Sequence, residues 1–120
     1  MTKDDTPRVY VMQEVPNRDF TKAAKFGKIV FLTAREPTQY GESPLNADIM
    51  QEVATGLLPY RAGVDFVIPS GSPIVMAMCM MIIGRAGNKI KMLQWHNRER
   101  VYNEFVLDLD WLRQEACVVI

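Results

Sequence analysis

The longest unbroken apolar run of the chain, eleven residues from Pro73 to Ile83, limits the folds that are open to it. A transmembrane helix needs about 18–20 apolar residues, so this run is too short to cross a bilayer. Extending it back to Phe66 takes it through Pro69-Ser-Gly-Ser-Pro73, which would break a helix. The run therefore predicts a helix inside a water-soluble protein, with Ser72 as N-cap and Pro73 at the first position.

This predicted helix is apolar on every side, and methionine supplies much of its surface. Such a helix must also be covered on every side. In a chain of 120 residues, the cover is either the C-terminal segment or a second subunit. Methionine suits adaptable contact surfaces. The sequence therefore predicts a homodimer whose interface contains Met76, Met78, Met80 and Met81.

Apolar runs and turn residues alternate along the chain in the order β-α-β-α-β-α-β-β. The expected strands are 8–14, 28–33, 64–68, 89–95 and 100–109. The expected helices are 20–26, a second that begins near Ser43-Pro44 or Asn46 and ends at about 58, and 73–83. Four consecutive apolar residues within 28–33 favour a central strand that is covered on both faces. We therefore expect a single three-layer α/β domain over residues 1–120. Its mixed, mostly parallel sheet should have about five strands, helices on both faces and a C-terminal antiparallel hairpin.

Strand 100–109 alternates in the way that is typical of a half-exposed hairpin strand. Val101, Phe105, Leu107 and Leu109 fall on one face, and Tyr102, Glu104 and Asp108 fall on the other. A short helix is expected at 110–116, followed by a small strand or docking tail at 117–120.

The polar segment 1–7 has no apolar stretch of the signal-peptide kind, and we expect it to be a short disordered tail. The two cysteines, Cys79 and Cys117, cannot form a disulfide framework. Together these features favour a reducing cytoplasm.

Fourteen basic and fourteen acidic residues give a formal net charge of zero. This disfavours proteins that coat nucleic acid or anionic lipid with their whole surface. The charges are unevenly spread, however, because 85–100 is basic and 101–120 is acidic. A second basic group follows one helical face at Lys22, Lys25 and Lys28.

The basic hairpin region 85–100 could bind nucleic acid. Cationic side chains next to aromatic rings can hold phosphates and stack a base. The residues in question are Lys89, Lys91, Trp95, Arg98 and Arg100, with Tyr102 beside them. The simpler interpretation is a solvated sheet edge whose lysines discourage aggregation.

The 68–73 junction, where a strand passes through a Ser/Gly loop into a helix, is a candidate binding site for an anion or nucleotide. Ligands of open α/β sheets bind beyond the carboxyl ends of strands, and a helix N-terminus attracts phosphate. The candidate residues are Ser70, Gly71 and Ser72, with Arg98 and Arg100. Against this, Pro73 removes one N–H group, and neither common phosphate-loop motif is present. Alternatively, Ser72 caps the helix, Gly71 makes the turn and nothing binds.

His96, the single histidine, lies at the expected hairpin tip. It could serve in acid–base chemistry or in pH sensing, although a histidine in a polar turn is usually just solvated. It has no second histidine at metal-ligand spacing. The sequence thus predicts no metal site and no cofactor, and it identifies no catalytic residue.

Several segments, taken in order, resemble short, uncharacterised α/β proteins encoded by tailed bacteriophages. These segments are Val15-Pro-Asn-Arg-Asp-Phe20, Phe26-Gly-Lys-Ile-Val-Phe-Leu32, Asp65-Phe-Val-Ile-Pro-Ser-Gly-Ser-Pro73 and Lys91-Met-Leu-Gln-Trp95, followed by Tyr102 and Leu107-Asp-Leu109. The resemblance implies a phage accessory protein that acts in an infected bacterium. It implies no activity and no functional residues.

The leading hypothesis is a small, non-enzymatic accessory protein that acts in the host cytoplasm as a homodimer, through a protein partner such as a host factor. The first alternative is a protein that binds or modifies a nucleotide or phosphorylated small molecule at the 68–73 junction. The second alternative is nucleic-acid binding through the basic hairpin 85–100.

Overall fold

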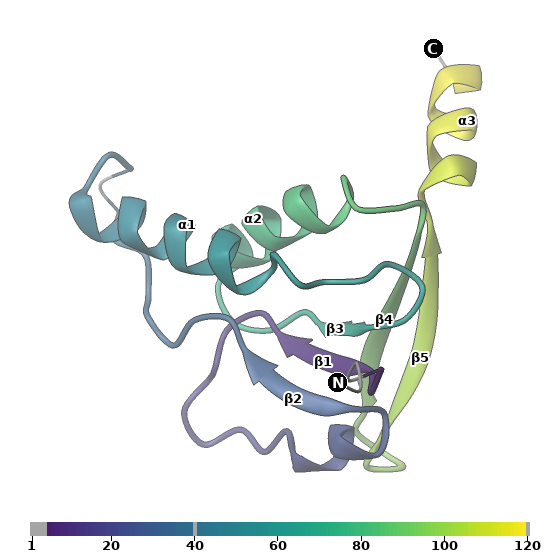
Figure 1. Cartoon of the computed structure of the whole chain (residues 1–120), viewed down its shortest axis with the longest axis horizontal. Helices are drawn as coiled ribbons and strands as arrows, with labels where there is room; N and C mark the ends of the chain where they lie inside the picture. The colour runs from purple at the N-terminus through teal and green to yellow at the C-terminus, as the bar shows by residue number, and fades with distance from the viewer. Residues whose placement is uncertain (1–4, 40, 120) are drawn as a thin grey trace.

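The computed structural model describes residues 5–39 and 41–119, with side chains as far as Gln114. Five strands form one sheet in the order β2-β1-β3-β4-β5 (Figure 1). They are β1 (Arg8–Val11), β2 (Lys28–Phe31), β3 (Phe66–Ile68), β4 (Lys89–His96) and β5 (Val101–Asp108). The helices are η1 (Thr21–Lys25, 3-10), α1 (Pro44–Gly56), α2 (Pro73–Ile83) and α3 (Leu109–Val119). The first four strands run parallel and β5 is antiparallel to β4, which confirms the predicted α/β fold and its C-terminal hairpin.

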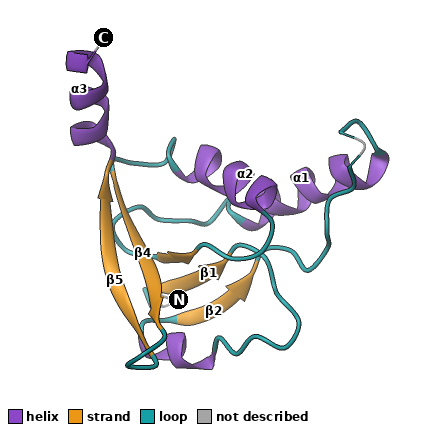
Figure 2. Cartoon of the chain, turned by 180° about the vertical axis from the view of Figure 1, so that it is seen from behind, coloured by secondary structure: helices purple, strands orange, loops and turns teal. Residues whose placement is uncertain are grey.

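The two faces of the sheet have separate cores, because successive strand residues point to opposite sides. Tyr10 and Val67 pack beneath α1 and α2 on one face, and Val9 and Val11 pack against the η1 region on the other. Figure 2 shows α1 and α2 together on one side and the short η1 turn at the foot of the sheet. The second face is therefore covered by a five-residue 3-10 helix, where the sequence predicts a helix over 20–26.

Both long helices begin where the Ser-Pro pairs predict. Ser43 accepts a hydrogen bond from the backbone N–H of Asn46 (3.1 Å), and Ser72 accepts one from Ile74 (3.2 Å). In each case proline follows at the first helical position, where its missing N–H is not needed.

β2 corrects one expectation, because it forms an edge of the sheet and is not central. Its apolar run is still used on both faces, since Ile29 packs against one core and Val30 against the other. Phe31, at the end of the strand, is 44% exposed. A strand can be covered on both faces of the sheet even when it pairs with only one neighbouring strand. An apolar run therefore does not show whether a strand is central or at an edge.

β5 corrects a second expectation, because its buried side changes along the strand. Near the turn, Tyr102 is almost fully buried on the η1 face, although the sequence places it on the polar side. Farther along, Leu107 packs against the α1–α2 core, while Phe105 between them is 56% exposed. The hairpin strands β4 and β5 have eight residues each, whereas the neighbouring β3 has three. The hairpin is therefore longer than the strand beside it, and different elements cover the two ends of β5.

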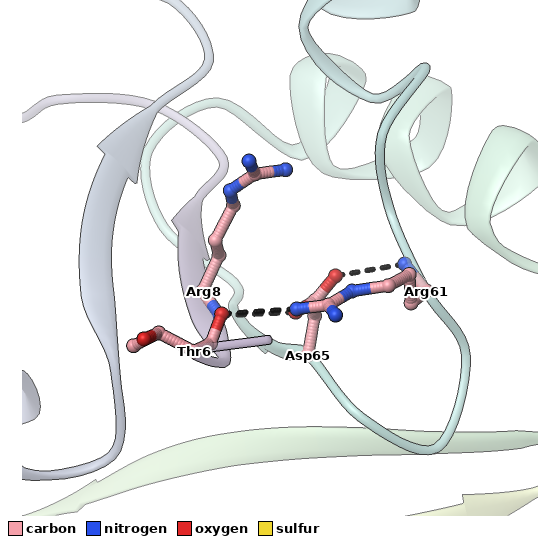
Figure 3. A network of polar contacts seen from close by, with 4 residues as sticks. All are labelled: Thr6, Arg8, Arg61 and Asp65. Atoms are coloured by element: carbon pink, nitrogen blue, oxygen red, sulfur yellow. Dashed lines mark hydrogen bonds and ion pairs between the residues drawn. The ribbon is translucent and has the colours of Figure 1, made fainter. Parts of the chain in front are cut away.

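A fully buried carboxylate, that of Asp65, joins the starts of β1 and β3 (Figure 3). It accepts hydrogen bonds from the backbone N–H groups of Arg8 (2.9 Å) and Arg61 (2.8 Å) and from Nη2 of Arg61 (3.0 Å). The same Nη2 donates to the carbonyl oxygen of Thr6 (2.9 Å). Asp65 therefore fixes the amino-terminal edge of the sheet.

Thr6 and Pro7 belong to the segment in which the sequence predicts a disordered tail, yet both are tied to the domain. Besides the Thr6 contact, the carbonyl oxygen of Pro7 accepts a hydrogen bond from the backbone N–H of Lys28 (2.9 Å). Residues 1–4 of the expected tail lie outside the described residues.

Replacing Asp65 with alanine should lower the free energy of unfolding by about 3 kcal/mol, because one change leaves several donors without their acceptor. The matched control is Lys89→Ala, which removes a solvent-exposed ion pair to Asp108 (3.6 Å) and should leave stability almost unchanged. Urea denaturation monitored by circular dichroism measures both. Equal losses in the two variants would contradict the central role of Asp65.

Candidate functional site

The strand order reverses between β1 and β3, because β2 lies beyond β1 and β4 lies beyond β3. In open α/β sheets this crevice at the carboxyl ends of the strands is the usual place for a ligand. The predicted anion site at 70–72 follows β3 directly and therefore lies at this reversal point.

The side chain of Gln13 already fills the reversal point. Its Oε1 accepts a hydrogen bond from the backbone N–H of Ser72 (2.5 Å), and its Nε2 donates to the carbonyl oxygen of Arg35 (3.0 Å). The hydroxyl of Ser70 donates to the carbonyl oxygen of Gln13 (2.7 Å) and accepts from its backbone N–H (3.2 Å). Gln13 and Ser70 are 1% and 2% exposed. The Ser70 hydroxyl and the Ser72 N–H, which the predicted site would offer to an anion, are thus engaged within the chain.

Gly71 lies against the same glutamine. Its φ of +82° is readily adopted only by glycine, and a Cβ atom there would lie 2.6 Å from Cβ of Gln13. This geometry supports the interpretation in which Gly71 makes the turn and Ser72 caps α2.

A separate hollow, here called the hairpin cleft, lies where the β4–β5 turn meets residues 17–22. It has a volume of about 270 Å³. Three cationic side chains line it, together with Trp95, Tyr102, Asn17 and one carboxylate, that of Asp19. The cations are Arg18, Lys22 and Arg100.

Direct contacts hold the two sides of the hairpin cleft together. Nζ of Lys22 donates a hydrogen bond to the carbonyl oxygen of Arg100 (2.9 Å) and lies 5.8 Å from the ring centre of Trp95. The rings of Trp95 and Tyr102 meet edge to face at 4.9 Å. Burial raises the pKa of Tyr102, so its hydroxyl stays protonated near neutral pH.

Asp19 uses its carboxylate locally. Its Oδ1 accepts a hydrogen bond from the backbone N–H of Thr21 (2.8 Å), and hydrogen bonding to Thr21 lowers the pKa of Asp19. This contact stabilises the start of η1.

The structure brings together only part of the predicted hairpin set. Trp95 and Arg100 line the cleft, whereas Arg98 is exposed in the turn outside its lining. Lys89 pairs with Asp108, and Nζ of Lys91 lies 5.1 Å from the ring centre of Phe66.

Sequence reasoning did not connect Arg18 and Lys22 with the hairpin, because they lie far from it along the chain. In the sequence, the basic group of Lys22, Lys25 and Lys28 was the pattern that pointed to this part of the cleft. Arg100 lies with Arg18 and Lys22 in the hairpin cleft. It is not beside Ser70, Gly71 and Ser72, because the 70–72 loop leads into α2 on the other side of the sheet (Figures 1 and 2).

His96 is solvent-exposed at the end of β4, and its carbonyl oxygen closes the turn by accepting from the backbone N–H of Arg100 (2.7 Å). Within the described residues, no three side chains of the His, Cys, Asp or Glu type group together in a way that could hold a metal ion. The helices in this part of the chain also include none that is long and apolar enough to span a membrane.

The predicted methionine surface is only partly covered. Met76, Met78 and Met80 are half-buried, whereas Met81 is 75% exposed. The fully buried side of α2 carries Val75, Cys79 and Ile83. Within the single chain, α2 is thus fully buried along one side only, and the predicted homodimer stays a prediction.

The pair Gly71→Ala and Gly63→Ala tests the closed reversal point. Both glycines have a left-handed φ, but a Cβ atom at Gly63 meets open space and one at Gly71 meets Gln13. Gly63→Ala should cost about 1 kcal/mol of unfolding free energy from backbone strain. Gly71→Ala should cost clearly more, because Gln13 must also move. Thermal denaturation compares them, and equal costs would argue against the packing of Gln13.

The Cys79 thiol should be unreactive in the folded protein, because burial raises its pKa from 9.0 to about 12. In a Cys117→Ser background, Ellman's reagent at pH 8 should react slowly with the native protein and quickly in guanidinium chloride. Since the unfolded thiol ionises first, stability should also fall as the pH rises from 9 towards 12. Fast labelling under native conditions would contradict this burial.

The chain matches the family model described as "Phage Pam3 gp32-like protein" over residues 7–109. The match spans all five strands and reaches the first residue of α3. Comparisons with curated proteins and with solved structures found no match. The resemblance to phage-encoded α/β proteins is thereby confirmed, and the chain belongs to the Phage Pam3 gp32-like protein family.

Proposed function

We propose that this phage protein is an accessory protein that acts by protein–protein contact, and that it associates with a second copy of itself through α1 and α2. The observation that supports this most directly is the outer side of α2. No residue of this helix is charged, yet Ile74 is 59% exposed and Met81 is 75% exposed. Apolar surface of this kind, gathered on one helix, is typical of an interaction site.

The neighbouring helix extends this surface. Met50 of α1 is 48% exposed and lines a groove of about 440 Å³ together with Ile74 and Met78. The loop before α1 and the start of α1 form the rest of its lining, with Pro37, Thr38, Gln39, Gly41 and Asn46. Its apolar helix side and its more polar loop side suit an amphipathic helix from a partner.

The C-terminal helix does not cover this groove in its own chain. Figures 1 and 2 both show α3 standing away from the rest of the molecule. Two of its apolar side chains, Trp111 and Leu112, are 58% and 42% exposed. The C-terminal segment of the same chain thus leaves the outer side of α2 open, which supports a second subunit as its cover.

A second copy supplies the complementary element. α2 and α3 have eleven residues each, so each is about 16 Å long. Two copies related by a two-fold axis can exchange α3 helices, so that each α3 lies against the α1–α2 groove of the other. The formal net charge of zero removes the general repulsion between like-charged copies.

The proposed function predicts a concentration-dependent dimer in sedimentation equilibrium. Met81→Glu and Trp111→Ala should each raise the dimer dissociation constant about 30-fold, which corresponds to the roughly 2 kcal/mol of an interface hot spot. Leu58→Glu is the matched control, since Leu58 is 82% exposed but lies outside α1 and α2 and does not line the groove. Circular dichroism should show the wild-type fold in all three variants.

Alternatively, this surface could bind a different protein, such as a host factor. In that case the purified protein would remain a monomer at every loading concentration. That result would overturn the proposed self-association.

A further inference from the structure

We propose that the hairpin cleft is a binding site for a nucleotide, either free or as one unit of a single strand. This site is separate from the proposed self-association surface. α1 and α2 cover one face of the sheet (Figure 2), whereas Trp95 and Tyr102 of the cleft pack in the core on the η1 face. The two proposals can therefore fail independently.

The charge of the hairpin cleft favours an anionic ligand. Three cations line it against one carboxylate, and that carboxylate already accepts the backbone N–H of Thr21. Within the part of the chain that the structure describes, no ion pair of 4 Å or less neutralises Arg18, Lys22 or Arg100. A concave site with an excess of positive charge attracts anions, and arginine and lysine are the usual phosphate-binding side chains.

An aromatic ring lies beside these cations. Trp95 is half-buried and lines the cleft, where Lys22 and Tyr102 hold its indole in place. A fixed indole next to positive charge can stack the planar base of a ligand whose phosphate is held by the cations. Inorganic phosphate would contact the cations but not the Trp95 ring, whereas a nucleotide would contact both.

Backbone strain is concentrated at the same place. Among the described residues, Asn17 (φ 66°) and Arg100 (φ 54°) are the non-glycine residues with positive φ, and both line the hairpin cleft. Asparagine tolerates this conformation well, but arginine is unusual in it and glycine adopts it without steric cost. A charged side chain thus occupies a turn position where glycine would be more stable, and strain of this kind often marks a functional site.

The size of the cleft limits the ligand. Its volume of about 270 Å³ is slightly below the usual range of roughly 300–1,000 Å³ for small-molecule pockets. It therefore suits one nucleotide unit and not a dinucleotide cofactor.

The test uses a Trp111→Phe variant of the full chain, so that Trp95 alone reports by fluorescence. The probes are ATP, a ten-residue oligothymidine and inorganic tripolyphosphate at equal ionic strength. ATP, the oligothymidine or both should bind saturably, more tightly than tripolyphosphate, and less tightly as the salt concentration rises. Tighter binding of ATP assigns the site to free nucleotides, and tighter binding of the oligothymidine assigns it to a single strand.

Arg100→Gly separates binding from stability. It should raise the dissociation constant at least tenfold while the thermal midpoint stays the same or increases, because glycine relieves the strain. Arg98→Gly is the matched control: it removes the same charge from the same turn but outside the cleft, and should change affinity less than twofold. The proposal is overturned if neither nucleotide probe binds, if tripolyphosphate binds as tightly as both, or if Arg98→Gly weakens binding as much as Arg100→Gly.

Discussion

The buried carboxylate of Asp65 holds the start of β1 beside the start of β3. A charge removed from water is tolerated only where donors surround it, and the start of β1 and the loop after α1 supply those donors. The sheet is thereby fixed at its amino-terminal edge with β1 beside β3. Gln13 does the equivalent at the carboxyl edge, where it joins the end of β1 to the start of α2. Both ends of the central strand pair are closed by side chains of the chain itself.

This closure determines where a ligand or partner can bind. In open α/β sheets, ligands bind at the reversal point, but here the amide side chain of Gln13 occupies it. The hollows proposed as binding sites lie at the periphery. One is the charged, aromatic hairpin cleft, and the other is the groove between α1, α2 and the loop before α1. In a small domain, a short sheet can be fixed in this way by a few buried polar contacts.

The parts of this fold that could be predicted are those set by neighbouring residues. The Ser-Pro pairs at 43–44 and 72–73 mark helix starts through contacts within one turn. The hairpin likewise follows from two adjacent strands. Gln13 and Ser70 meet across 57 positions, and Lys22 and Arg100 across 78, so no local pattern reveals either contact. The edge position of β2 was missed for the same reason, because it depends on which strand pairs with β1 and not on the residues of β2.

The arrangement of the two surfaces has a consequence for how they would work together. If two copies pair through α1 and α2, the opposite faces of their sheets point outward, and each carries a hairpin cleft. A free nucleotide would fill each cleft independently. A single strand long enough to reach both would gain avidity, because its second contact is intramolecular. Weak binding in one cleft of about 270 Å³ would then still give firm attachment of a strand, and self-association would set the affinity without contributing a residue to either site.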